Sequence, residues 1–180
     1  MKLPPKFLRE LKEASFNQDN LRRACEHLFN DGSMYFHGPA KAGKTLYACA
    51  IFMYGQQKFL VNSEDWVIEF VNVAQLLEDL RPNSTTSEKD LRYYQNADWL
   101  ILDDFGTEKS TEWVFERLYL LVNHRYSYCK PTIVTSNYDL QELAERLNDP
   151  RIIWRLADMC VVKEFKLVDF NKQHKMQRSK

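Results

Sequence analysis

The sequence lacks the features that would place the chain in a membrane or in a disulfide-stabilised class. No run in its 180 residues approaches the ~18 apolar residues that span a bilayer, and residues 1–6 do not lead into the apolar core of a signal peptide. The four cysteines are scattered without a C-x-x-C pair, so neither a structural zinc site nor a disulfide framework is indicated. We therefore expect a cytoplasmic protein with no membrane partner.

An excess of either charge is also missing. Lys+Arg and Asp+Glu are 25 each, so the formal net charge is zero. A protein that coats nucleic acid by bulk charge would be strongly basic, and any such contact here must come from a local patch. The length suits one domain with a real core.

Short apolar runs alternate with helix-like stretches along the chain. Strands are predicted at residues 34–37, 66–71, 99–102, 132–135 and 160–165. Helices are predicted within residues 1–33 and at 44–54, 73–80, 111–126, 139–147 and from 151 onward. Residues 82–90 are polar and predict a surface loop. Such alternation predicts an α/β fold with a mostly parallel sheet.

Residues 38–45 match G-x-x-x-x-G-K-[ST], between a predicted strand and a predicted helix. Glycines let a backbone curl so that its N–H groups face phosphate oxygens, and the helix N-terminus adds a positive end. Lys44 would reach the β- and γ-phosphates, and Thr45 would be a ligand of Mg²⁺. A chance glycine turn is the alternative, but the strand–loop–helix context favours ATP with Mg²⁺. The predicted nucleotide-binding residues are Gly38, Pro39, Ala40, Lys41, Ala42, Gly43, Lys44, Thr45 and Leu46.

Two acidic residues, Asp103 and Asp104, follow the apolar run at 99–102. Adjacent carboxylates after a buried strand are unfavourable unless a cation or water receives them. In a P-loop ATPase the first, Asp103, would support Mg²⁺, and the second, Asp104, would polarise the attacking water. The alternative is an ordinary surface turn after a core strand.

Over residues 16–170 the chain resembles the AAA+ domains of DnaC/IstB type. The residues that carry this resemblance are 38–45, 70–73, 76–77, 102–106, 112–114, 122–126, 131–137 and 151–156. The resemblance implies a P-loop NTPase three-layer sandwich with a five-stranded sheet in the order 5-1-4-3-2. It also implies ATP-controlled assembly on DNA or on a replicative helicase. We expect three segments: a short N-terminal extension at 1–15, an AAA+ ATPase domain at 16–170 and a polar basic tail at 171–180.

The resemblance further assigns roles to three residues near the end of the domain. Asn137 would be the polar sensor that helps to hold the attacking water. Of Arg151 and Arg155, one would reach a neighbouring subunit's γ-phosphate and the other would sense its own. Alternatively, residues 135–137 could cap the helix that begins near Asp139. The two arginines could also form an exposed face paired with Glu145 or Asp158. Arg125 could join an interface or pair locally.

The chain departs from the family pattern at Lys41, where a glycine is usual. Few residues precede Phe16, although loaders of this type normally carry an N-terminal segment that grips the helicase. We also expect no helical lid domain after the last strand.

Residues 81–92, followed by Tyr93 and Tyr94, lie where related initiator ATPases place helices that touch single-stranded DNA. Basic groups follow phosphates and aromatic rings stack on bases, so the composition suits this role. The alternative is a solvated loop and helix whose tyrosines pack inward.

Three functions remain in competition. The first is an ATP-hydrolysing accessory protein of DNA replication or transposition, with a helicase or a transposase as partner. The second is a nucleotide-gated binding module with little hydrolysis, and the third is a small P-loop phosphotransferase. Asp104 and Asn137 favour the first, since a pure binding switch needs neither.

Overall fold

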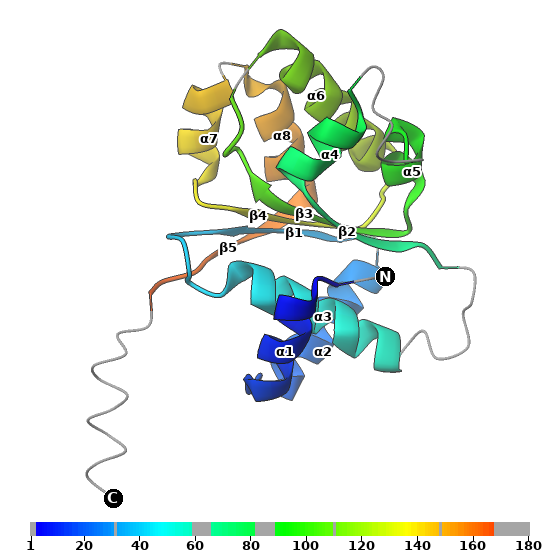
Figure 1. Ribbon diagram of the computed structural model, residues 1–180, viewed down its shortest axis with the longest axis vertical. Coiled ribbons are helices and arrows are strands. Elements are labelled where there is room, and N and C mark those ends of the chain that lie inside the picture. Colours follow the sequence, from blue (N-terminus) through cyan, green and yellow to red (C-terminus); the bar gives the residue numbers. More distant parts are fainter. Residues whose placement is uncertain are drawn as a thin grey trace, which may run out of the picture.

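A parallel sheet runs through the middle of the molecule, with helices on both faces (Figure 1). The computed structural model describes residues 3–30, 32–58, 66–81, 89–109, 111–147 and 149–167. Within them the strands are β1 (Ser33–His37), β2 (Ile68–Asn72), β3 (Trp99–Phe105), β4 (Thr132–Ser136) and β5 (Cys160–Glu164). Their order is β2-β3-β4-β1-β5, and every pairing is parallel. The predicted α/β fold and the order 5-1-4-3-2 are therefore confirmed.

The helices form one layer on each side of the sheet (Figure 1). The first layer contains α1 (Pro5–Glu13), α2 (Gln18–Phe29) and α3 (Lys44–Lys58). The second contains α4 (Val73–Asp79), α5 (Leu91–Asn96), α6 (Glu112–Ser127), α7 (Leu140–Leu147) and α8 (Pro150–Met159). None of the helices among the described residues is long and apolar enough to cross a bilayer.

The alternation of side chains along the strands divides the core between these layers. In β1, Met34 and Phe36 pack toward α2 and α3, whereas Tyr35 packs on the opposite side. In β3, Ile101 belongs to the same hydrophobic cluster as Met34 and Phe36, and Leu102 belongs to the cluster of Tyr35. Both faces of these strands are covered, which explains why their sequences are continuous apolar runs.

Three element boundaries differ from the predictions. The predicted helical region 1–33 is two helices, because Asn17 begins α2 by accepting a hydrogen bond from the Asn20 amide at 3.0 Å. The second strand begins at Ile68 and not at residue 66, and Trp66 instead packs on the rings of Phe29 and Trp99. The third strand continues past Leu102 to Phe105, so both acidic residues lie within it.

Helix α5 was not predicted as a separate element. Asp90 begins it by accepting a hydrogen bond from the Tyr93 amide at 2.9 Å. Most of the predicted loop at 82–90 and all of the predicted tail at 171–180 lie outside the described residues. The predicted extension at 1–15 includes α1, whose Phe7 ring lies 5.8 Å from that of Phe70 in β2.

The buried side chain of Arg125 joins α6 to neighbouring chain segments through hydrogen bonds. Its side chain is fully buried. Its guanidinium donates to the Thr132 hydroxyl at 2.8 Å and to four backbone carbonyls. Those carbonyls belong to Tyr94, Gln95, Ala97 and Pro131. Arg125 therefore finds its partners within its own chain and is not available to a subunit interface.

Candidate nucleotide-binding site

The loop at residues 38–45 joins β1 to α3 at the carboxyl edge of the sheet, the usual ligand edge of a parallel sheet. Gly38, Lys41 and Gly43 have positive φ angles of 135°, 65° and 90°. A Cβ on Gly38 would overlap the carbonyl oxygen of Phe165, so glycine is required there both for its φ and for space. Lys41 adopts the left-handed conformation without being glycine, which costs about 1 kcal/mol.

Lys44, the lysine of this loop, is almost completely buried, and its ammonium has three acceptors. It donates to the carbonyls of Gly38 at 2.8 Å and Pro39 at 2.9 Å, and to Asn137 Oδ1 at 3.0 Å. Burial lowers the pKa of Lys44, while Asp104 and Asp103 act in the opposite direction. The fold thus brings together the predicted phosphate lysine and the predicted sensor.

Asp103 sits at the carboxyl end of β3, and its side chain is 5% exposed. Its Oδ1 accepts hydrogen bonds from the Thr45 hydroxyl at 2.6 Å and from the Thr135 hydroxyl at 2.7 Å. Burial raises the pKa of Asp103, and these two hydroxyls lower it. A carboxylate beside a hydroxyl is a set of hard oxygen donors that fits Mg²⁺, and a cation there would offset the burial of the negative charge.

Asp104 adopts a left-handed backbone conformation, with a φ of 59°. Its amide donates to Thr135 Oγ1 at 3.1 Å, and its carboxylate accepts from Asn72 Nδ2 at 3.3 Å. A non-glycine residue in this region is strained, and such strain is found mainly at functional sites. The hydrogen bond from Asn72 places the Asp104 carboxylate next to the end of β2.

Asn72 and Thr135 contact the acidic pair and were not identified from the sequence. Asn72 ends β2, where it lies opposite Asp103 in the strand register, and its Oδ1 also begins α4 through the Ala74 amide. Thr135 donates to Asp103 and accepts from the Asp104 amide. The usable signal was the position of each at the end of a strand next to β3.

Asn137 follows β4 and does not cap the next helix. Asp139 performs that function by accepting a hydrogen bond from the Glu142 amide at 2.8 Å. The Ser136 hydroxyl accepts from the Tyr138 amide at 3.1 Å. The capping alternative for Asn137 is therefore wrong, and its side chain is directed to Lys44.

The family model of IstB-like ATP-binding proteins matches residues 7–179 of this sequence. The chain belongs to this family. The predicted resemblance to DnaC/IstB-type AAA+ proteins is thereby confirmed.

Two relatives of this IstB-like chain carry the name replicative helicase loader. DnaI of Bacillus subtilis (strain 168) is 32% identical over 111 residues, which cover 61% of this chain and 34% of DnaI. DnaC of Escherichia coli (strain K12) is 28% identical over 123 residues, which cover 67% of this chain and 48% of DnaC. The chain thus matches only about a third to a half of the length of these relatives.

The fold is shared with solved loader structures. A crystal structure of DnaI superposes with a TM-score of 0.71 at 24% sequence identity, and the match covers 93% of each chain. Similarity at this level of identity shows the fold alone. What the site of the IstB-like chain can do therefore depends on its own residues.

The two candidate arginines of the IstB-like domain lie on α8, next to α6. Arg151 forms an ion pair with Asp149 at 2.8 Å. Arg155 donates to Asn123 Oδ1 at 2.6 Å and to the Tyr119 hydroxyl at 3.1 Å. The arginines are therefore not paired with Glu145 or Asp158, which was the alternative considered from the sequence. Among the described residues, no hydrogen bond joins either arginine to the loop at 38–45.

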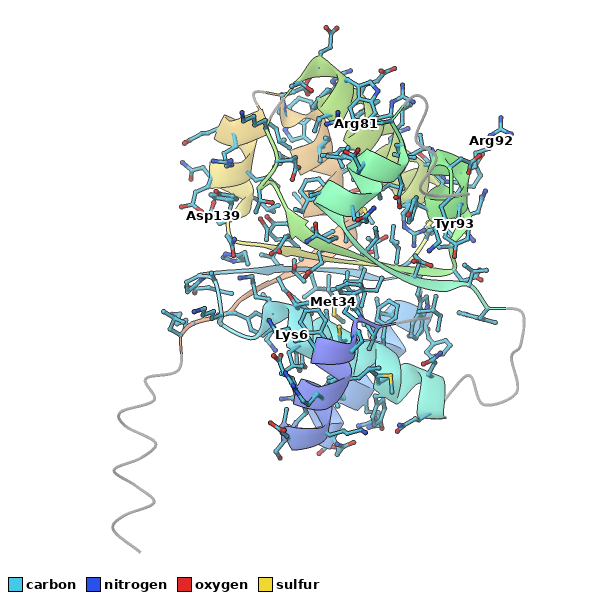
Figure 2. The ribbon with its side chains drawn as sticks, viewed as in Figure 1. Lys6, Met34, Arg81, Arg92, Tyr93 and Asp139 are labelled. Carbon is cyan, nitrogen blue, oxygen red and sulfur yellow. The ribbon has the colours of Figure 1, made fainter. Side chains whose placement is uncertain are left out.

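The candidate nucleic-acid segment is only partly suited to base stacking. Tyr94 is buried, and its hydroxyl donates to Asp79 at 2.9 Å, so it is not available to a base. The Tyr93 hydroxyl donates to Glu69 at 2.7 Å. The inward-packing alternative therefore describes Tyr94 correctly. Arg92, in contrast, projects away from α5 (Figure 2).

Proposed function

We propose that this IstB-like chain binds and hydrolyses ATP with Mg²⁺ and acts as a helicase-loader-like accessory ATPase in DNA replication. The observation that carries the proposal is the contact of Lys44 with Asn137 beside the contact of Thr45 with Asp103. Four residues from three separate segments meet at one edge of the sheet, where the predicted phosphate loop lies. Neither a chance glycine turn nor a surface Asp-Asp turn requires such convergence.

Binding is proposed to begin at the loop itself. The backbone amides of residues 38–45 cradle phosphate oxygens, and Lys44 exchanges its carbonyl acceptors for the β- and γ-phosphates. Thr45 and Asp103 supply oxygen donors that hold the metal ion. When bound, Mg²⁺ supplies positive charge that offsets the charge of the phosphates.

Hydrolysis is proposed to depend on Asp104, the only carboxylate of the pair that is not engaged by Thr45. Asp104 accepts a hydrogen bond from the attacking water, and Asn137 helps to place that water against the γ-phosphate. Asn72 is a positioning residue, because its amide donates to Asp104 at 3.3 Å. The strained backbone of Asp104 and the Thr135 contact fix where this carboxylate can point.

The proposed site is completed by assembly, with Arg151 or Arg155 supplied by a neighbouring subunit. Both lie on the α6–α8 side of the molecule and bind partners there. An arginine remains charged and can grip phosphate oxygens with two parallel hydrogen bonds. The proposed ATPase domain comprises residues 16–170, preceded by the extension at 1–15 and followed by the tail at 171–180.

A replicative helicase is the proposed protein partner, since two relatives are named as loaders of one. Single-stranded DNA is a second proposed partner, through the basic residues Arg81, Lys89 and Arg92. The test of the central proposal is an ATPase assay with and without Mg²⁺ over a range of protein concentrations. Mg²⁺-dependent hydrolysis supports it. Tight ATP binding without hydrolysis at any concentration would favour a nucleotide-gated binding module instead.

A further inference from the structure

Arg151 and Arg155 are held in different ways, although they lie one turn apart on α8. Arg155 is fixed by Asn123, by Tyr119 and by the carbonyl of Arg151 at 2.8 Å. Side-chain contacts to Arg151 come from one carboxylate, that of Asp149, and from two rings. Its guanidinium lies 5.0 Å from the Phe115 ring centre and 4.8 Å from that of Tyr119. The side chain of Arg151 is 51% exposed, whereas Arg155 is half-buried, so Arg151 is the more accessible of the two.

The carboxylate of Asp149 accepts hydrogen bonds from both the backbone and the side chain of Arg151. Asp149 Oδ1 accepts from the Arg151 amide at 2.9 Å, which begins α8. The same carboxylate accepts from Arg151 Nε at 3.0 Å and from Nη2 at 2.8 Å. Both carboxylate oxygens are thus used on one guanidinium, in the fork geometry that a phosphate would also need.

We propose that Asp149 is a positioning residue that holds Arg151 in the isolated subunit and must release it when Arg151 binds the phosphate of a neighbouring subunit. This inference rests on the proposed function, and it selects Arg151 over Arg155. Asp149 occupies the Nε–Nη2 edge of the guanidinium, so a phosphate can bind that edge only after Asp149 releases it. The internal ion pair therefore competes with assembly, while the rings of Phe115 and Tyr119 flank the same guanidinium at 5.0 Å and 4.8 Å.

The helix cap and the ion pair can be separated by one substitution. Asn begins helices as well as Asp does, so Asp149→Asn retains the cap on the Arg151 amide while it removes the charge that holds the guanidinium. Asp149→Ala removes both. Asp90→Asn is the matched control, since Asp90 also begins a helix, α5, by accepting from a backbone amide.

The experiment measures ATPase rate per subunit against protein concentration, without DNA, for the full chain and these variants. Asp149→Asn is expected to lower the concentration at half-maximal rate by roughly two- to five-fold, the range that one exposed ion pair supports. Its ATP affinity well below that concentration, its unfolding midpoint and the Asp90→Asn curve should all match the parent. Arg151→Ala should abolish the concentration dependence.

The possible failures are distinguishable. A parent protein without ATP binding, or with a rate independent of concentration, overturns the proposed function and this inference with it. A concentration-dependent parent that Asp149→Asn leaves unchanged or weakens overturns only the role of Asp149. Retention of the concentration dependence by Arg151→Ala, with its loss in Arg155→Ala, assigns the neighbour's phosphate to Arg155 and also overturns the inference.

Discussion

The ammonium of Lys44 donates a hydrogen bond to the side chain of Asn137, 93 positions further along the chain, at 3.0 Å. The contact joins the loop after β1 to the end of β4, two strands that are neighbours in the sheet. The lysine that is proposed to bind phosphate and the amide that is proposed to bind water are therefore in direct contact. A γ-phosphate that attracts Lys44 would free the Asn137 oxygen for the water beside it.

Replacing this lysine tests the binding half of the proposal. Lys44→Ala should weaken ATP binding at least about 100-fold, because a charge-assisted contact to two phosphates is lost. The matched control is Lys130→Ala at the opposite, amino edge of the sheet, whose ammonium lies 3.6 Å from Asp98. Isothermal titration with ATP measures both, and circular dichroism checks that both fold. Parent-like affinity in Lys44→Ala would remove the phosphate-loop assignment.

The two acidic residues should fail in different ways. Asp104→Asn should retain ATP binding and lose hydrolysis by about 10²-fold or more, the scale of a general base. Asp103→Asn should also weaken binding in the presence of Mg²⁺, since its carboxylate meets Thr45 at 2.6 Å. Comparing ATP affinity with and without Mg²⁺ separates the two roles. Parent-like hydrolysis in both variants would favour the binding-module alternative.

Much of the site could be predicted because it depends on local patterns and on one topological rule. The loop at 38–45 is fixed by its spacing, and the carboxyl ends of parallel strands share an edge of the sheet. That rule brings Asp103 and Asn137 close to Lys44 without knowledge of side-chain positions. The same rule places Asn72 near the acidic pair, but it does not indicate which carboxylate Asn72 contacts. Asn72 lies opposite Asp103 in the β2–β3 register, and yet its amide donates to Asp104.

Arg125 shows a second limit of the sequence. A cationic residue near the end of a helix normally faces solvent, and nothing local to α6 indicates burial. Its partners are carbonyls at the end of α5 and before β4, together with the Thr132 hydroxyl in β4, which only tertiary packing brings together. Likewise, Tyr94 looks suited to base stacking in the sequence but turns inward to Asp79.

The burial of Arg125 leads to a stability prediction. Arg125→Lys should lower the free energy of unfolding by about 2–4 kcal/mol, because an ammonium cannot reach five oxygens in a forked arrangement and leaves buried carbonyls unpaired. Arg22→Lys, at an exposed pair with Glu26, should change it by less than about 0.5 kcal/mol. Urea unfolding measures both. Equal effects would mean that the buried fork is not stabilising.

Contact with single-stranded DNA, if the basic residues near α5 provide it, should depend strongly on salt. Changing Arg81, Lys89 and Arg92 together to Ala should weaken binding. The slope of log K against log salt concentration should become shallower by the amount expected for the loss of about two to three phosphate contacts. Arg81 and Lys89 are paired with Glu78 and Glu69, so part of their charge is already offset. Fluorescence anisotropy with a labelled oligonucleotide and ATP, at several salt concentrations, measures this. Absence of binding at low salt would exclude a direct role of this surface.

The final prediction concerns the shared site. If an arginine on α8 completes the site of the next subunit, a subunit that lacks it still offers an intact phosphate loop and acidic pair. An Asp104→Asn subunit lacks the general base but still offers its arginine. Mixing Arg151→Ala with Asp104→Asn subunits should therefore restore part of the ATPase rate, although each alone is inactive. An arginine supplied by a neighbouring subunit accelerates turnover roughly 10³–10⁵-fold in well-studied NTPases, so even a minority of mixed interfaces should give a measurable rate.

The control mixture of Lys44→Ala with Asp104→Asn should not recover, because both defects lie on the same side of the interface. If Arg155 is the residue supplied, rescue should appear with Arg155→Ala instead. No rescue by either arginine variant, with a rate independent of concentration, would mean that one chain holds a complete site.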